Sequence, residues 1–254
     1  MTGEPCLWGM GERVVNLKLR NRLSEVLLKE LNEGDETETL VFLAAYCQTV
    51  RARGMTKVEL EDLSLPNSQL LSHVVDLGIL CIDHGNTSSP QIDLLPQFNQ
   101  ELDYLCERVA AYRRAVSESR RGPPLLQGLD WAIRIGALLF NEGLYFECHE
   151  FLEGFWRQEK GEAREFLQGI ISLATAFYHL ERGNRPSAVK LFNDAHRRLE
   201  AFGKVHRGLA IEALIHQTRK VQTLVEEGGL VALEQLKQTP LPKVEINKID
   251  RFEK

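Results

Sequence analysis

The residues best suited to chemistry are a histidine and several carboxylates in the segment 140–156, which also contains six aromatic residues. Glu147, His149, Glu150 and Glu153 fall within about two turns if this segment is a helix. Because residues four apart share a helix face, we expect His149 and Glu153 to lie side by side. An imidazole beside carboxylates can bind a metal ion or transfer protons, so this segment is the candidate site.

A second polar feature lies on the next predicted helix, 166–180, which is apolar on nearly all sides. Four polar residues follow one stripe of it at spacings of four, three and four: Gln168, Ser172, Thr175 and His179. A buried polar group without a hydrogen-bond partner costs about 1–3 kcal/mol, so the stripe must face polar partners. We therefore predict that the stripe meets His149, Glu150 and Glu153.

Three interpretations of this centre are open. One is a structural hydrogen-bond network, because such networks perturb ionisable groups without catalysis. Another is a divalent metal site formed by His149, Glu150, Glu153 and His179. It is not the zincin motif, which needs a histidine in place of Glu153. The third is general acid–base catalysis, for which Glu147 is a further candidate. The supporting polar residues would be Asn141, Tyr145, Trp156, Gln168, Ser172 and Thr175.

A longer pattern resembles a known family. The runs are FNEGLYFECHEFLEGFW from Phe140, FLQGIISLATAFYHLERGN from Phe166 and AVKLF from Ala188. They are similar to domain-of-unknown-function family 309 over residues 130–205. The matching positions are Asn141, Gly143, Glu147, His149, Glu150, Glu153, Trp156, Gln168, Gly169, His179, Gly183 and Asn184. Ser172 stands where the family commonly has glutamine. The resemblance implies an all-helical bundle with a shared polar centre, and it assigns no reaction.

The elements that would hold this centre are predicted from apolar periodicity and from glycines that end helices. We expect helices over 125–140, 144–156, 166–180, 186–202 and 208–225, and a short piece at 230–236. Short turns between such helices favour an antiparallel bundle over residues 123–237. Residues 238–254, which contain two prolines, are expected to form an extended tail.

The first half, residues 1–96, is predicted to contain helices followed by a small β-hairpin. The helices are expected around 23–31, 38–46, 56–63 and 66–77, and the two strands at 79–82 and 91–95, joined by a loop at 83–90. This order resembles a winged helix-turn-helix domain over residues 37–96. No lysine or arginine occurs from Val58 to Glu107, and DNA binding depends on cations that neutralise phosphates. We therefore favour an interaction or dimerisation module over a DNA-binding regulator.

Residues 97–122 are expected to form a helix with a heptad repeat, followed by a linker. The seam consists of Phe98, Leu102, Leu105, Val109, Tyr112 and Val116. Such a seam either packs against its own domain or pairs with another protein, most simply the same helix of a second copy in a homodimer.

Composition limits the remaining possibilities. The chain has 254 residues and a net charge of −5, which suits two globular domains and provides no basic field for nucleic acid. It has no segment near the roughly 20 apolar residues of a membrane span, so we expect a cytoplasmic protein. The five cysteines are odd in number and lack a C-x-x-C pair, which favours reduced thiols.

The predicted fold class is mainly α. The leading functional hypothesis is a non-enzymatic interaction or oligomerisation protein. The alternative is a metal-dependent, hydrolase-like enzyme, and the third is a DNA-binding regulator acting through residues 37–96.

Overall fold

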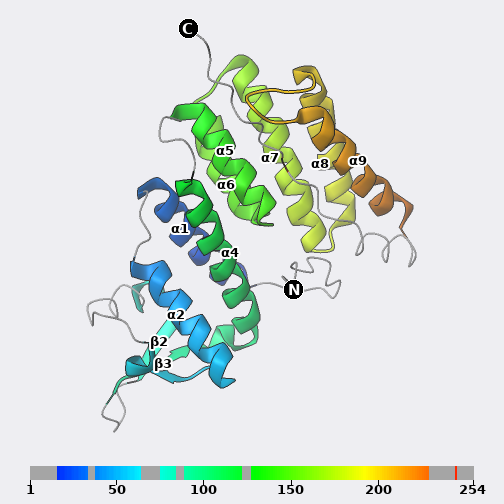
Figure 1. Cartoon of the computed structure of the whole chain (residues 1–254). Coiled ribbons are helices and arrows are strands. Elements are labelled where there is room, and N and C mark those ends of the chain that lie inside the picture. The colour runs from blue at the N-terminus through cyan, green and yellow to red at the C-terminus, as the bar shows by residue number, and fades with distance from the viewer. Residues whose placement is uncertain are drawn as a thin grey trace. The chain divides into compact units, whose positions relative to one another are not determined.

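The computed structural model describes residues 16–33, 38–63, 75–83, 89–121, 127–228 and Val244 (Figure 1). The chain divides into two compact units, one over Val15–Arg121 and one that contains Gly122–Lys254. The described residues are mostly helical, with one small antiparallel sheet. The predicted mainly α class is therefore confirmed. The boundary between the two units lies after Arg121, close to the end of the segment 97–122 that was predicted as the heptad helix and linker.

Three helices build the core of the first unit: α1 (Leu17–Glu33), α2 (Glu38–Arg53) and α4 (Leu102–Arg120). The 3-10 helix η2 (Pro96–Glu101) leads into α4. In α1, Leu19, Leu23 and Leu27 are spaced by four and have no exposed surface, so they form the apolar stripe that the periodicity predicts. Both α1 and α2 pack against α4.

The sheet of the first unit has the strand order β1-β3-β2. Its strands are β1 (Val58–Glu59), β2 (Leu80–Asp83) and β3 (Gln91–Leu94), and both pairings are antiparallel. Strands β2 and β3 confirm the two predicted extended runs. Val58 lies opposite Ile92, and Ile92 also lies opposite Ile82, so β3 is the central strand.

The helix predicted at 56–63 is wrong in its first half. Residues 58–59 form β1, and only Leu60–Leu63 turns, as the 3-10 helix η1. The Asp62 carboxylate accepts the backbone N–H of Glu59 at 3.2 Å, and the N–H of Leu60 donates to the Pro90 carbonyl at 2.9 Å. The backbone N–H groups of Glu59 and Leu60 are therefore bonded to the Asp62 carboxylate and the Pro90 carbonyl rather than to helical carbonyls. Pro90 is distant in the sequence, so a local capping pattern cannot predict this bond.

Most of the predicted helix at 66–77 and of the loop at 83–90 lies outside the described residues, although Val75 and Asp76 are helical. DNA binding by a winged helix-turn-helix domain would depend on these segments. The winged-helix resemblance and the DNA-binding hypothesis therefore stay predictions.

The heptad seam is buried within its own unit. Phe98, Leu105, Val109, Tyr112 and Val116 each expose at most 3% of their surface, whereas Leu102 is partly exposed. A second chain would reach the buried side chains only if α4 separated from α1 and α2. Homodimerisation through this seam stays a prediction, and packing against its own domain accounts for the burial.

The second unit is an antiparallel succession of helices (Figure 1). They are α5 (Gly128–Asn141), α6 (Tyr145–Trp156), α7 (Gly161–Glu181), α8 (Arg185–Leu199), the 3-10 helix η3 (Glu200–Phe202) and α9 (Ile211–Glu227). Each α-helix packs chiefly against its neighbours in the chain, and the α7–α8 pair is the most extensive. Gly143 and Gly183 turn the chain with φ of 69°, a conformation that glycine adopts without strain.

Helix α7 begins earlier than predicted, at Gly161 rather than Phe166. Its first turn is mostly polar and partly exposed, so apolar periodicity could not detect it. Farther along, α7 is buried on most sides, as expected of a central helix. The predicted piece at 230–236 and the tail at 238–254 lie outside the described residues, apart from Val244.

An aromatic chain crosses four helices in the core of this unit. Ring centroids are 5.1 Å apart between Phe140 and Tyr145, 5.0 Å between Tyr145 and Phe177, and 5.2 Å between Phe177 and Phe192. These contacts join α5, α6, α7 and α8. Such aromatic pairs contribute about 0.5–1.5 kcal/mol each beyond the burial of their area.

Among the described helices, none combines the length and apolarity needed to cross a membrane. Location in the cytoplasm stays a prediction.

Candidate functional site

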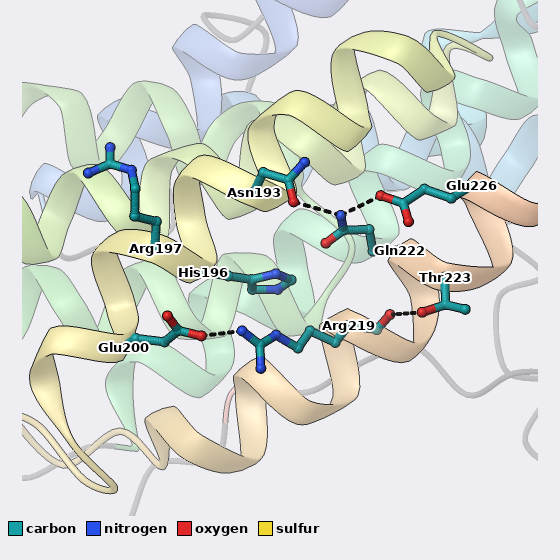
Figure 2. Close-up of a pocket in the computed structure, with 8 residues that line it drawn as sticks. All are labelled: Asn193, His196, Arg197, Glu200, Arg219, Gln222, Thr223 and Glu226. Carbon is teal, nitrogen blue, oxygen red and sulfur yellow. Dashed lines mark hydrogen bonds and ion pairs between the residues drawn. The ribbon is translucent and has the colours of Figure 1, made fainter.

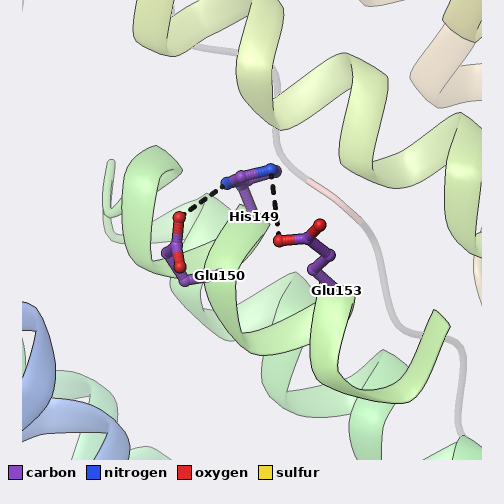
Figure 3. A group of neighbouring side chains, drawn as sticks. All are labelled: His149, Glu150 and Glu153. Carbon is purple, nitrogen blue, oxygen red and sulfur yellow. Dashed lines mark ion pairs between the residues drawn. The ribbon is translucent and has the colours of Figure 1, made fainter. Parts of the chain in front are cut away.

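Three of the predicted site residues come together on α6. The Nδ1 atom of His149 lies 3.2 Å from Oε1 of Glu150, and its Nε2 atom lies 3.9 Å from Oε2 of Glu153 (Figure 3). One donor atom from each residue lies within 4.8 Å of the others. The three side chains are 28%, 38% and 28% exposed, respectively. The imidazole is therefore held between two carboxylates and is open to solvent.

This His149 cluster has the ligand chemistry of a divalent metal site, because imidazole and carboxylates suit transition-metal ions. When the imidazole is protonated, both contacts become ion pairs. Glu153 also pairs with Arg157 at 3.1 Å. A metal ion bound here would therefore compete with the Arg157 guanidinium for the same carboxylate.

His179 is not part of the metal-capable group found among the described residues. It lies on α7, where burial and then the neighbouring Arg182 lower the pKa of its imidazole. The ring centroid of Phe146 on α6 lies 6.5 Å from that of His149 and 5.5 Å from that of Tyr178, the residue before His179. Tyr178 of α7 thus packs against Phe146 of α6.

The polar stripe of α7 has different partners from those expected. Ser172 donates to Asp194 of α8 at 2.8 Å, and Gln168 donates to Ser172 at 3.4 Å. Thr175 donates to the Ile171 carbonyl of its own helix at 2.8 Å. The prediction that the stripe meets α6 therefore does not hold for Ser172 and Thr175.

Asp194 is a half-buried partner that sequence reasoning missed. Burial alone would raise the pKa of its carboxyl, but hydrogen bonds from Arg198, Ser172 and Arg197 outweigh that effect and lower the pKa. Arg198 also pairs with Glu165 of α7. The four-residue spacing of Asp194 and Arg198 was the available signal, since such pairs meet on one helix face.

The remaining predicted residues are divided between the core and the helix ends. Glu147 and Tyr145 are 0% and 1% exposed, and Tyr145 belongs to the aromatic chain. Glu147 lies in the first turn of α6, where the helix dipole favours a negative charge. At the other end of α6, the Arg164 guanidinium lies 3.6 Å from the Trp156 ring centroid. This cation–π contact connects the last residue of α6 to the first turn of α7.

Asn141 forms hydrogen bonds with a residue that is far away in the sequence. Its Nδ2 donates to the carbonyl of Val244 at 3.0 Å, and its Oδ1 accepts the backbone N–H of Val244 at 2.7 Å. The side chain of Val244 is buried, with 3% of the residue exposed. One amide side chain thus satisfies both backbone groups of one residue.

A polar pocket of about 380 Å³ lies between α8 and α9 (Figure 2). Helix α8 contributes Asn193 and His196, η3 contributes Glu200, and α9 contributes Arg219, Gln222 and Glu226. Nε2 of His196 lies 2.8 Å from the Thr218 hydroxyl oxygen, and His196 is only 4% exposed. Sequence reasoning missed this pocket because its residues have the composition of a solvated helix face.

Comparison with known proteins identifies part of the second unit. Residues 133–191 match the model of DUF309, a domain of unknown function. A 69-residue region is 36% identical to the uncharacterised protein YpuF of Bacillus subtilis, covering 27% of this chain and 40% of YpuF. The chain thus matches less than half of that relative. No solved structure matches significantly.

The DUF309 match confirms the family resemblance that the sequence predicted. It includes Asn141 and the His149 cluster and ends within α8. The pocket residues from Asn193 onward lie beyond it.

Proposed function

We propose that the second unit is a non-enzymatic interaction module that binds an extended peptide segment at Asn141. The supporting observation is the pair of hydrogen bonds between the Asn141 amide and the backbone of Val244. A primary amide has a donor and an acceptor on one plane, so it can pair with the N–H and C=O of one extended residue. This recognition depends on backbone conformation rather than on a particular charged side chain.

The neighbouring burial adds selectivity for an apolar side chain. Fully burying a valine side chain contributes about 1.5–3 kcal/mol, and each hydrogen bond contributes about 0.5–1.5 kcal/mol. These values favour a peptide segment with a small apolar residue at the position that hydrogen-bonds to Asn141. In this chain the occupant is Val244 itself, so a partner peptide would compete with an intramolecular segment.

A peptide-binding experiment tests this proposal on the full-length chain. The substitution Val244→Asp places a charge where the apolar side chain is buried, which should release the internal segment. A fluorescein-labelled peptide with the sequence of residues 240–250 should then bind, as measured by fluorescence anisotropy. The wild-type chain should bind the peptide more weakly, because its own segment competes.

The decisive comparison is the double variant Asn141→Ala, Val244→Asp, which should not bind the peptide. The matched control Asn21→Ala, Val244→Asp changes an exposed asparagine of α1 and should bind as well as the single variant. Equal binding by the Asn141 and Asn21 double variants would refute a role for Asn141. So would the absence of any binding to the Val244→Asp chain.

A second candidate function, a metal-dependent hydrolase-like enzyme, is supported by the His149 cluster. His149, Glu150 and Glu153 would be the ligands, because their donor atoms converge within 4.8 Å. His179 was part of the ligand set predicted from the sequence, and the group that converges here does not include it.

Elemental analysis after incubation with zinc or manganese tests this candidate. The wild-type chain should retain stoichiometric metal after desalting, and His149→Gln should lose it. The control His216→Gln changes an exposed histidine of α9 and should keep the metal. A hydrolase would also show ester hydrolysis that EDTA abolishes. Equal metal contents in the two variants, or none in the wild type, would remove this candidate.

A further inference from the structure

Two cysteines that are far apart in the sequence meet in the core of the first unit. Cys47 lies on α2 and Cys106 on α4, two helices that pack against each other. Their thiols hydrogen-bond to each other, and both cysteines are free in this structure. Cys81 and Cys148 instead donate to backbone carbonyl groups. Among the described cysteines, Cys47 and Cys106 therefore form a pair of thiols in direct contact.

The two thiols of this pair differ in acidity. The hydrogen bond that Cys47 donates lowers the pKa of the Cys106 thiol, and the cation of Arg51 acts in the same direction, although burial and the carboxylates of Asp103 and Glu107 oppose the change. The same hydrogen bond and then burial raise the pKa of the Cys47 thiol. Because the thiolate is the reactive form of cysteine, Cys106 is the nucleophile of the pair.

Packing alone does not call for two sulfurs at this place. A buried thiol packs as a small apolar side chain, so one cysteine and one aliphatic residue would fill the same space. Two thiols in contact can also form a disulfide, whose sulfurs lie about 2.05 Å apart. This bond removes two hydrogens and adds no atom, so it needs no extra volume in the close-packed core.

We propose that Cys47 and Cys106 are a redox-convertible pair, which a hydroperoxide oxidises to a disulfide between α2 and α4. The Cys106 thiolate attacks one oxygen of hydrogen peroxide, the O–O bond breaks, and the sulfur becomes a sulfenic acid. Cys47 then attacks that sulfur, the S–S bond forms, and the S–O oxygen leaves as water with the Cys47 proton. In total, two thiols lose two electrons and two protons, and one peroxide becomes two waters.

Burial selects the oxidant and sets the consequence. Cys47 and Cys106 are 6% and 2% exposed, so a small uncharged oxidant has access that a bulky disulfide reagent lacks. The new bond would hold α4 against α2, and α4 carries the heptad seam residues Leu105 and Val109 on either side of Cys106. Oxidation would therefore keep the seam closed within its own unit. This pair is independent of the function proposed for the second unit.

Mass spectrometry of the full-length chain tests the proposal. No lysine or arginine occurs from Val58 to Glu107, so trypsin leaves Cys81 and Cys106 in one peptide, and a Cys81→Ser background removes this ambiguity. The folded chain is treated with hydrogen peroxide, remaining thiols are blocked with N-ethylmaleimide in denaturant, and the tryptic peptides are analysed without reductant. The Cys47 and Cys106 peptides should be joined, with the loss of two free thiols per chain, and dithiothreitol should restore both thiols.

Single variants in the same background test the two roles. Cys47→Ser should leave Cys106 as a sulfenic acid that dimedone traps, whereas Cys106→Ser should leave Cys47 unlabelled by dimedone. The matched control Cys148→Ser changes a cysteine of α6 and should form the disulfide as the parent chain does. Circular dichroism of each variant confirms that it is folded.

Three results would overturn the proposal. One is that Cys47 and Cys106 both remain available to N-ethylmaleimide after the folded chain has been treated with peroxide. Another is that peroxide joins either of them chiefly to Cys6 or Cys148. The third is that dimedone labels Cys47 in the Cys106→Ser variant as readily as it labels Cys106 in the Cys47→Ser variant.

Discussion

Acidification should destabilise the second unit through His196. Burial, reinforced by the positive charge of Arg219, lowers the pKa of the His196 imidazole from 6.5 to about 4, although Glu200 and Gln222 oppose the change. Between these two pKa values the unfolded chain binds a proton that the folded chain does not. Stability must therefore fall as the pH drops through 6.5, and this loss levels off below about pH 4.

The magnitude follows from the two pKa values. The full effect is about 3 kcal/mol, and the part expected between about pH 7.5 and pH 5 is ~2 kcal/mol. Solvent screening should reduce this little, because His196 is only 4% exposed. A loss of this size is a large fraction of the 5–15 kcal/mol that typically stabilises a folded protein.

Urea unfolding followed by tryptophan fluorescence measures this effect. A Trp8→Phe background leaves only Trp131 and Trp156, which both lie in the second unit. The variant His196→Gln keeps a hydrogen-bonding side chain but cannot titrate, so its stability should depend less on pH by ~2 kcal/mol over this range. The control His216→Gln should keep the wild-type pH dependence, because His216 is exposed.

The decisive quantity is the difference between the wild type and His196→Gln, because it isolates the contribution of this one side chain. If both chains lose the same stability between the two pH values, the argument from burial is wrong. If His196→Gln and His216→Gln reduce the pH dependence equally, His196 has no special role.

Two further predictions concern the packing of α7 on α8. A Cβ atom at Gly169 would lie 2.8 Å from side-chain atoms of Leu199, so Gly169→Ala should cost about 1–3 kcal/mol in urea unfolding. Gly154→Ala has open space and should instead stabilise by about 0.5–1 kcal/mol, so equal effects would contradict the packing argument. Ser172→Ala removes a hydrogen bond to the Asp194 carboxylate and should cost about 1.5–3 kcal/mol in the same assay, whereas an unchanged midpoint would show that this bond contributes nothing.

The helices of the second unit could be predicted from the sequence because each signal is local. Apolar spacing marked α5, α6 and α8, and Gly143 and Gly183 marked the turns that follow α5 and α7. The helix predicted from 56 to 63 failed where a long-range contact decided the structure. Val58 pairs with Ile92 in the sheet, and no local pattern contains that information.

The candidate site was predictable only within one helix. Helical spacing correctly brought His149 and Glu153 together, with Nε2 and Oε2 3.9 Å apart. The partner of Ser172 was not predictable, because the sequence does not state which neighbouring helix a buried face meets. Asp194 and His196 lie among the charged residues of α8, where a solvated face was the simpler interpretation.

The two hydrogen bonds between Asn141 and Val244 join residues that are 103 positions apart in the sequence. Closing so long a loop costs chain entropy that the local turns between successive helices do not pay. This contact should accordingly form late in folding and open more often than the helices around it. The amide hydrogen of Val244 would then exchange with solvent sooner than amides in the middle of α7. The same brief openings would give a competing peptide its opportunity to enter without any unfolding of the bundle.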